Sequence, residues 1–157
     1  MSVPALEITN LVKHFGQTKA VDDVSFQVDP GEVFGFLGPN GAGKTTTIRC
    51  LMDFYRPSSG SVKVFGFDAK NQGVAARAHI GFMPQATSLN DRWSGREHVA
   101  YVSALHHTKN QADELAQEFE LDLDRRVKHL STGNKQKLAL LLAFMHDADL
   151  IILDEPT

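Results

Sequence analysis

The sequence predicts an α/β fold, and three observations lead to that prediction. Short apolar runs of the kind that buried strands need alternate with stretches whose apolar residues repeat at helical spacing. A glycine-rich turn separates the continuous apolar run at residues 33–37 from a helical pattern that contains Ile48, Leu51 and Met52. A second apolar run, residues 150–153, ends in two acids. Strand, glycine loop and helix in that order favour parallel strands covered by helices.

The first part of the chain, about residues 1–30, is expected to form an antiparallel β layer. Residues 6–15 and 24–28 have strand patterns, and the Gly16-Gln17 turn lies between them. The turn residues Asp29-Pro30-Gly31 end the second strand.

The rest of the chain alternates between strand and helix patterns. The breaker cluster at residues 56–60 ends the helix after the glycine loop, whose apolar face extends to Tyr55. We expect strands at residues 61–65, 80–83 and 150–153, a short helix near 71–77, a helical stretch over 94–119, and a last helix carrying Leu138, Leu141, Leu142 and Met145.

The glycine-rich turn carries the clearest chemical signal. Its residues, Gly38-Pro39-Asn40-Gly41-Ala42-Gly43-Lys44-Thr45, satisfy G-x-x-x-x-G-K-[ST] between a strand and a helix. Glycines let successive N–H groups converge on phosphate oxygens, with the positive end of the helix dipole beneath them. Lys44 is expected to reach the β- and γ-phosphates, and Thr45 to bind magnesium through its hydroxyl. The alternative is a glycine-rich turn with an incidental lysine.

The acids after the last strand supply a second chemical element. A strand that ends in acids can deliver a carboxylate to magnesium and another to water. Asp154 is therefore expected to hold the metal, and Glu155 to orient or deprotonate the attacking water. Acids in this place often mark only the exit from a strand, but the phosphate loop favours the functional interpretation.

Composition excludes several classes of protein. Apolar residues make up 42% of the 157 residues, charged residues make up 22%, and the net charge is -3. These values argue against disorder and against a nucleic-acid-binding protein. Cys50 is the single cysteine, which excludes a disulfide framework and a cysteine zinc site. It lies on the apolar side of the predicted helix after the glycine loop, so its side chain is expected to be packed. The chain has neither a signal pattern nor eighteen consecutive apolar residues, so it is not expected to cross a membrane by itself.

Along its whole length the chain resembles the ATP-binding cassette (ABC) ATPases that power transporters. Residues 38–46, ending in Thr46, resemble the phosphate loop of that family, and Gln85 resembles its Q-loop glutamine. Leu130-Ser131-Thr132-Gly133-Asn134 resembles the signature, and residues 151–157 resemble the magnesium strand. The looser signature, together with residues 31–37, resembles the ABC-2 branch that exports drugs, antibiotics or polysaccharides.

The resemblance implies further roles for individual residues. Phe15 lies where the family places an aromatic ring that stacks on adenine, and Gln85 is implied to serve both the metal and catalysis. Ser131 and Gly133 are implied to cap the γ-phosphate of ATP that is bound on a partner subunit. Thr132 and Asn134 replace Gly and Gln of the family's Leu-Ser-Gly-Gly-Gln, which weakens this contact.

The resemblance also implies a whole-molecule function. ATP and Mg2+ are the expected ligands, and two subunits, as a homodimer or a pair of ABC subunits, are expected to sandwich the nucleotides and move a separate integral membrane permease. The implied place is cytoplasmic, peripheral on the inner face of the membrane. The alternative is a nucleotide-binding module that does not hydrolyse ATP. A chromosome or DNA-repair cassette is disfavoured because Ser131 comes only 46 positions after Gln85, which leaves no room for a long coiled coil.

The same resemblance divides the chain into parts of the family fold and implies that other parts are absent. It assigns residues 31–85 and 132–157 to a P-loop ATPase core and residues 86–131 to a helical insert, in a partial nucleotide-binding domain. A later strand of the family fold, expected between the phosphate-loop strand and the magnesium strand, and a γ-phosphate histidine are absent from residues 1–157. The chain is thus expected to be a piece of a longer subunit or to have rearranged strands. Trp93 and Arg96 are expected at the groove for the transporter's cytoplasmic helix. The alternative is a Trp93 that is simply buried or lies on an ordinary surface.

Overall fold

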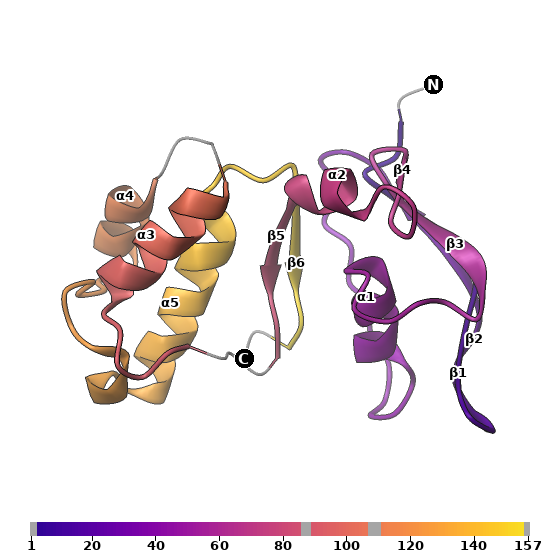
Figure 1. The fold of residues 1–157 in the computed structure, drawn as a ribbon, viewed down its shortest axis with the longest axis horizontal. Coiled ribbons are helices and arrows are strands. Elements are labelled where there is room, and N and C mark those ends of the chain that lie inside the picture. The colour runs from indigo at the N-terminus through magenta and orange to yellow at the C-terminus, as the bar shows by residue number, and fades with distance from the viewer. Residues whose placement is uncertain (1–2, 86–88, 107–110, 156–157) are drawn as a thin grey trace. The chain divides into compact units, whose positions relative to one another are not determined.

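The computed structural model describes residues 3–85, 89–106 and 111–155, which fall into two compact units. Unit 1 comprises Met1–His79 and unit 2 comprises Ile80–Thr157. Figure 1 labels the helices and strands of both units. None of the described helices combines the length and the apolar character that crossing a bilayer requires.

Unit 1 is built on an antiparallel sheet in the order β2-β1-β3-β4. Leu6 and Ile8 are buried at alternate positions of β1, and Leu11 is buried after a register shift. Asn10, with φ 46°, lies at this shift, where the alternation of buried and exposed side chains moves by one residue. The apolar side chains of β1 therefore stay on one face of the sheet. The strands are β1 (Leu6–Phe15), β2 (Thr18–Val28), β3 (Ser59–Val64) and β4 (Phe67–Asp68).

Two helices complete unit 1. The helix α1 (Lys44–Leu51) packs against β2 and β3 and buries Thr47, Cys50 and Leu51, while α2 (Gly73–Ala78) packs against β3 and β4. The expected packing of Cys50 is confirmed, because its exposed fraction is 1%. Burial raises the pKa of this thiol above its usual value.

The strand predicted at residues 33–37 is wrong. No described strand includes these residues, Val33 is fully exposed, and Leu37 is 90% exposed. Phe34 and Phe36 instead pack on Phe26 of β2, with ring centroids 5.0 and 5.3 Å away. A central strand forms only where neighbouring strands satisfy its N–H and C=O groups, and the described residues provide none for this segment.

Unit 2 contains a parallel pair of strands covered by a helix. The strand β5 (Ile80–Met83) and the strand β6 (Leu150–Leu153) confirm two predicted strands, and they pair with each other in parallel. The helix α5 (Thr132–Phe144) lies against β5. It can approach closely because Gly81 has no side chain: a Cβ there would lie 2.1 Å from the carbonyl oxygen of Ala143.

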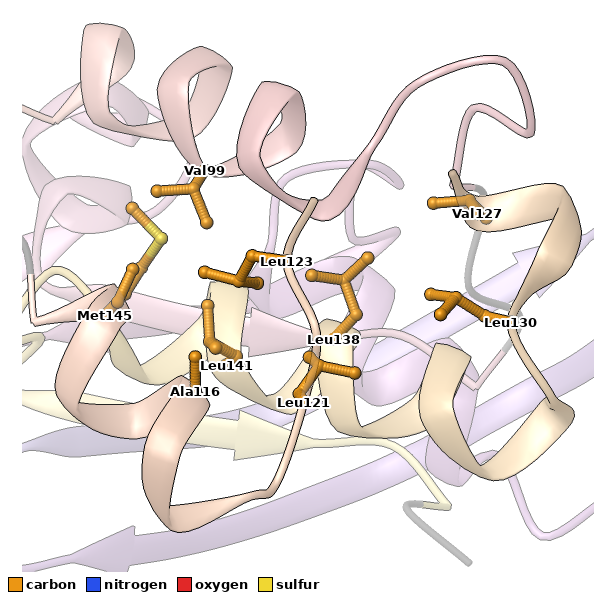
Figure 2. Packing of buried hydrophobic residues seen from close by; sticks show 10 residues of the cluster. Val99, Ala116, Leu121, Leu123, Val127, Leu130, Leu138, Leu141 and Met145 are labelled. Atoms are coloured by element: carbon orange, nitrogen blue, oxygen red, sulfur yellow. The ribbon is translucent and has the colours of Figure 1, made fainter. Parts of the chain in front are cut away.

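The predicted helical stretch at residues 94–119 contains two described helices. The helix α3 (Gly95–Leu105) starts with a capping box in which Ser94 accepts from the N–H of Glu97 and the Glu97 carboxylate accepts from the N–H of Ser94. The second helix is α4 (Ala112–Glu118), and a short 3-10 helix, η1 (Val127–His129), follows. These elements and α5 enclose one apolar cluster (Figure 2), which includes Val99, Ala116, Leu121, Leu123, Val127, Leu130, Leu138, Leu141 and Met145.

Candidate functional site

The phosphate-loop motif forms a tight turn directly before α1. The N–H of Ala42 donates to the carbonyl of Pro39 at 3.1 Å, and Gly41 and Gly43 have φ values of 83° and 86°. Both values lie in the left-handed region that glycine adopts without strain. Because α1 starts at Lys44, the exposed residues 38–42 lie at the positive end of its dipole. This part of the loop is open to an anionic ligand.

Lys44 folds back over this turn. Its ammonium donates to the carbonyl of Gly38 at 2.7 Å and to that of Pro39 at 3.0 Å. The charge is thus held beside the exposed backbone of the loop, where it can turn to an anion with little movement. Thr45 and Thr46 follow in the first turn of α1, and both are half-buried.

Phe15 lies at the end of β1, where the chain turns into β2. The residue is 45% exposed, and its ring meets the ring of Tyr55 in a T-shaped arrangement, with 5.2 Å between the ring centroids. The apolar pattern predicts Tyr55 on the helix after the loop, and this prediction is wrong, because α1 ends at Leu51 and Tyr55 lies beyond it. The sequence offered no signal that pairs the two rings, because 40 positions separate them.

The acids after β6 lie next to the residues that follow β5. Asp154 is 5% exposed, and its N–H donates to the carbonyl of Met83 at 2.9 Å, which extends the pairing of the two strands. Glu155 is exposed with φ 52°, and its carboxylate accepts from the side-chain amide of Gln85. Parallel strands end at the same edge of a sheet, and this edge brings Gln85, Asp154 and Glu155 together.

The predicted signature residues form the start of α5. Ser131 is the N-cap, and its hydroxyl oxygen accepts from the N–H of Asn134 at 3.2 Å. Thr132 and Gly133 are exposed, and a Cβ at Gly133 would meet nothing within 4 Å. Serine hydroxyl and first-turn N–H groups at an exposed helix start are suited to an anion. Of the predicted site residues, Gln85, the signature and the acids belong to unit 2, and the loop and Phe15 to unit 1.

The Trp93 and Arg96 side chains contact other residues of unit 2. The half-buried Trp93 packs against His98 and Tyr101, with ring centroids 5.2 and 5.6 Å away. Arg96 forms ion pairs with Asp124 at 2.8 Å and with Asp113 at 3.1 Å. The hydrogen bonds in these pairs raise the pKa of its guanidinium above the usual value.

Comparison with known proteins places these motifs in a family. The profile of the family described as ABC transporter matches residues 21–157. The Nod factor export ATP-binding protein I of Paraburkholderia xenovorans (strain LB400) is 36% identical over the whole chain, which covers 54% of that protein. The daunorubicin resistance ATP-binding protein DrrA3 of Streptomyces coeruleorubidus is 35% identical, with 100% of this chain and 52% of that protein covered. The ABC transporter ATP-binding protein NatA of Bacillus subtilis (strain 168) is 40% identical over 88% of this chain and 60% of its own.

Solved structures agree with these relatives. A structure described as an ATP binding subunit of an ABC transporter is 29% identical and has a TM-score of 0.89, with 97% of this chain and 66% of that chain covered. A bacterial Atm1-family ABC exporter with ATP bound is 26% identical, with a TM-score of 0.85 over 98% of this chain and 29% of its own. The predicted resemblance and fold class are thus confirmed, and the chain spans about half the length of the curated relatives it matches. On the profile, the relatives and the structures together, this chain belongs to the ABC transporter family.

Proposed function

We propose that this chain is an ATP-binding, ATP-hydrolysing part of the motor subunit of an ABC export transporter. The observation that supports the proposal best is the exposed loop at residues 38–42 with the Lys44 ammonium held beside it. The loop N–H groups and Lys44 would bind the phosphates of ATP. The ATP bound in the solved exporter and the ATP-binding names of two relatives favour the same ligand, and the Nod factor export protein and the solved exporter favour the direction.

The proposal assigns the chemistry to residues of both units. Thr45, Gln85 and Asp154 would hold Mg2+, a cation that proteins commonly bind through one or two carboxylates together with substrate phosphates. When bound, the metal would neutralise phosphate charge. Glu155 would accept a proton from the attacking water, and the amide of Gln85, which donates to its carboxylate, would orient that base.

The partners are part of the same proposal. Two nucleotide-binding subunits would close on each other, with Ser131 and Gly133 of one facing the γ-phosphate bound on the other. The exposed start of α5 with its serine N-cap is suited to that contact. Closure would drive an integral membrane permease from the cytoplasmic face. Copurification of the chain with a membrane subunit tests this part directly.

A second candidate is a module that binds ATP without hydrolysing it. The observation that favours it is that residues 33–37, which precede the phosphate loop, lie outside every described strand. Strand pairing among the described residues therefore does not fix the position of the loop. Binding needs only the local loop and helix, whereas hydrolysis needs the loop and Glu155 in fixed register.

Lys44→Ala tests nucleotide binding, which both candidate functions require. Removal of the ammonium takes away a charge-assisted contact worth about 2 kcal/mol, so the ATP Kd in calorimetry should rise about thirtyfold. Lys70→Ala, which removes an exposed lysine of the same unit, is the control and should bind ATP like the unaltered chain. An unchanged Kd for Lys44→Ala would contradict the proposal.

A further inference from the structure

Phe15 is one member of a cluster of three side chains, which we call the base platform: Lys13, Phe15 and Tyr55. The Phe15 and Tyr55 rings meet at 5.2 Å with an angle of 79° between their planes. The Lys13 ammonium lies over both rings, 4.9 Å from the centroid of Phe15 and 5.8 Å from that of Tyr55. Both geometries are favourable for aromatic pairs and for cation–π contacts.

Tyr55 is fixed to the helix that starts at the phosphate loop. Its N–H donates to the carbonyl of Arg49 at 3.1 Å, and the Arg49 guanidinium donates to its hydroxyl oxygen at 3.1 Å. The guanidinium also lies 5.6 Å from the centroid of the Tyr55 ring. Since Arg49 belongs to the last turn of α1, Tyr55 connects Phe15 to that helix.

Lys13 is fixed in a similar way. Its ammonium donates to the carbonyl of Arg56 at 2.7 Å, in the segment just after Tyr55. With the ammonium over one face of the Phe15 ring, that face is covered. Phe15 as a whole is 45% exposed, so the surface that a planar ligand would use is the ring face opposite the ammonium.

We propose that Tyr55 and Lys13 are positioning residues that hold the Phe15 ring in the orientation in which its open face stacks on the purine of ATP. The inference rests on the proposed function, ATP binding, and on the base-stacking role that the family resemblance implies for Phe15. Phe15 is the last residue of β1 and is followed directly by the Gly16 turn, so the contacts with Tyr55 and Lys13 restrict a ring at the end of the hairpin. A ring that is ordered in advance loses less entropy on binding and binds more tightly.

The test compares ATP with inorganic triphosphate, which has no base, by calorimetry on the full chain. Tyr55→Leu should weaken ATP about fivefold, which corresponds to one aromatic contact. Lys13→Met should weaken ATP about threefold through loss of the cation–π contact. Tyr55→Phe keeps the ring and should retain most of the ATP affinity. Triphosphate affinity should stay unchanged in all three variants.

Two variants serve as matched controls. Tyr101→Leu removes the other tyrosine of the chain, which is 55% exposed in unit 2. Lys19→Met removes a lysine of the β1–β2 hairpin that is paired with Asp22. Both should bind ATP and triphosphate like the unaltered chain.

A double-mutant cycle separates positioning from independent binding. If Tyr55 acts through Phe15, then Phe15→Ala with Tyr55→Leu should weaken ATP no more than Phe15→Ala alone. Additive losses, or equal losses for ATP and triphosphate, would overturn the inference. Should Tyr55→Leu not fold, the same cycle with Lys13→Met gives the decision.

The result also tells the inference apart from the proposed function. If Phe15→Ala weakens ATP while Tyr55→Leu and Lys13→Met do not, the inference is overturned and ATP binding at the platform stands. If the unaltered chain binds triphosphate but gains nothing from the base, the stacking role of Phe15 is wrong and the inference goes with it. If it binds neither ligand, the proposed function itself is wrong.

Discussion

Gly43 shows how one missing side chain shapes the phosphate loop. Its φ of 86° is strained for other residues, and a Cβ would lie 2.3 Å from the carbonyl oxygen of Ala20 on β2. The glycine therefore allows the start of α1 to lie directly against the sheet. Gly41 has a similar φ of 83°, but a Cβ there would meet nothing within 4 Å.

We expect Gly43→Ala to lower the free energy of unfolding by about 3 kcal/mol, since backbone strain adds to a clash that neither backbone can relieve locally. Gly41→Ala is the matched control and should cost about 1 kcal/mol, from strain alone. Urea unfolding of both variants measures the difference. Equal losses would show that the approach of α1 to Ala20 does not limit this position.

At the scale of elements, α3 and α5 meet at two histidines. His106 follows α3 and His146 follows α5, and their rings stack with centroids 4.0 Å apart. Burial, together with the neighbouring His146, lowers the pKa of His106 below its usual 6.5. The folded chain therefore favours the neutral form of His106.

This pKa predicts a loss of stability in mild acid. Below about pH 6.5 the unfolded chain binds a proton at His106 that the folded chain does not, so the free energy of unfolding falls as pH decreases through the folded pKa. His106→Gln removes the titration and should lose less stability than the unaltered chain between pH 7.5 and 5.5. Urea unfolding at the two pH values measures this, and the same loss in both proteins would contradict it.

At the scale of the whole molecule, the described strands form two separate sheets. Unit 1 contributes the antiparallel sheet against which α1 packs, and unit 2 contributes the β5–β6 pair, which Asp154 follows directly. Residues 33–37, which lead into the loop, belong to neither sheet. Within the described residues, no strand pairing fixes Lys44 relative to Glu155.

We therefore expect residues 1–157 to retain ATP binding better than ATP turnover. Glu155 can act as a base only on a water in line with the γ-phosphate, and a displacement of about 1 Å can cost on the order of a hundredfold in rate. A longer chain in which a further strand pairs with residues 33–37 should turn over ATP far faster. Phosphate release and calorimetry on both chains measure the two quantities.

The control for turnover is Glu155→Gln, which removes the base and leaves the loop unchanged. In the longer chain this substitution should abolish turnover and keep ATP binding. If residues 1–157 hydrolysed ATP as fast as the longer chain, and Glu155→Gln stopped that reaction, the expectation would be wrong.

The sequence by itself determined the features that local patterns encode. The apolar runs at residues 80–83 and 150–153 form strands, the helical periodicities form α3, α4 and α5, and the loop at residues 38–45 closes before α1. These features depend on neighbours within a few positions, through periodicity, capping and glycine conformations. The sequence motifs also identified the family, which the relatives confirmed.

Only the tertiary structure decided the features that depend on distant partners. The run at residues 33–37 is as apolar as a buried strand, yet it stays outside both sheets because strand formation needs pairing partners. The contact of Tyr55 with Phe15 and that of Gln85 with Glu155 join residues 40 and 70 positions apart. Periodicity carries no information about such pairs, since they form only when the packing of α1 on its sheet, or of β5 beside β6, brings the chain segments together.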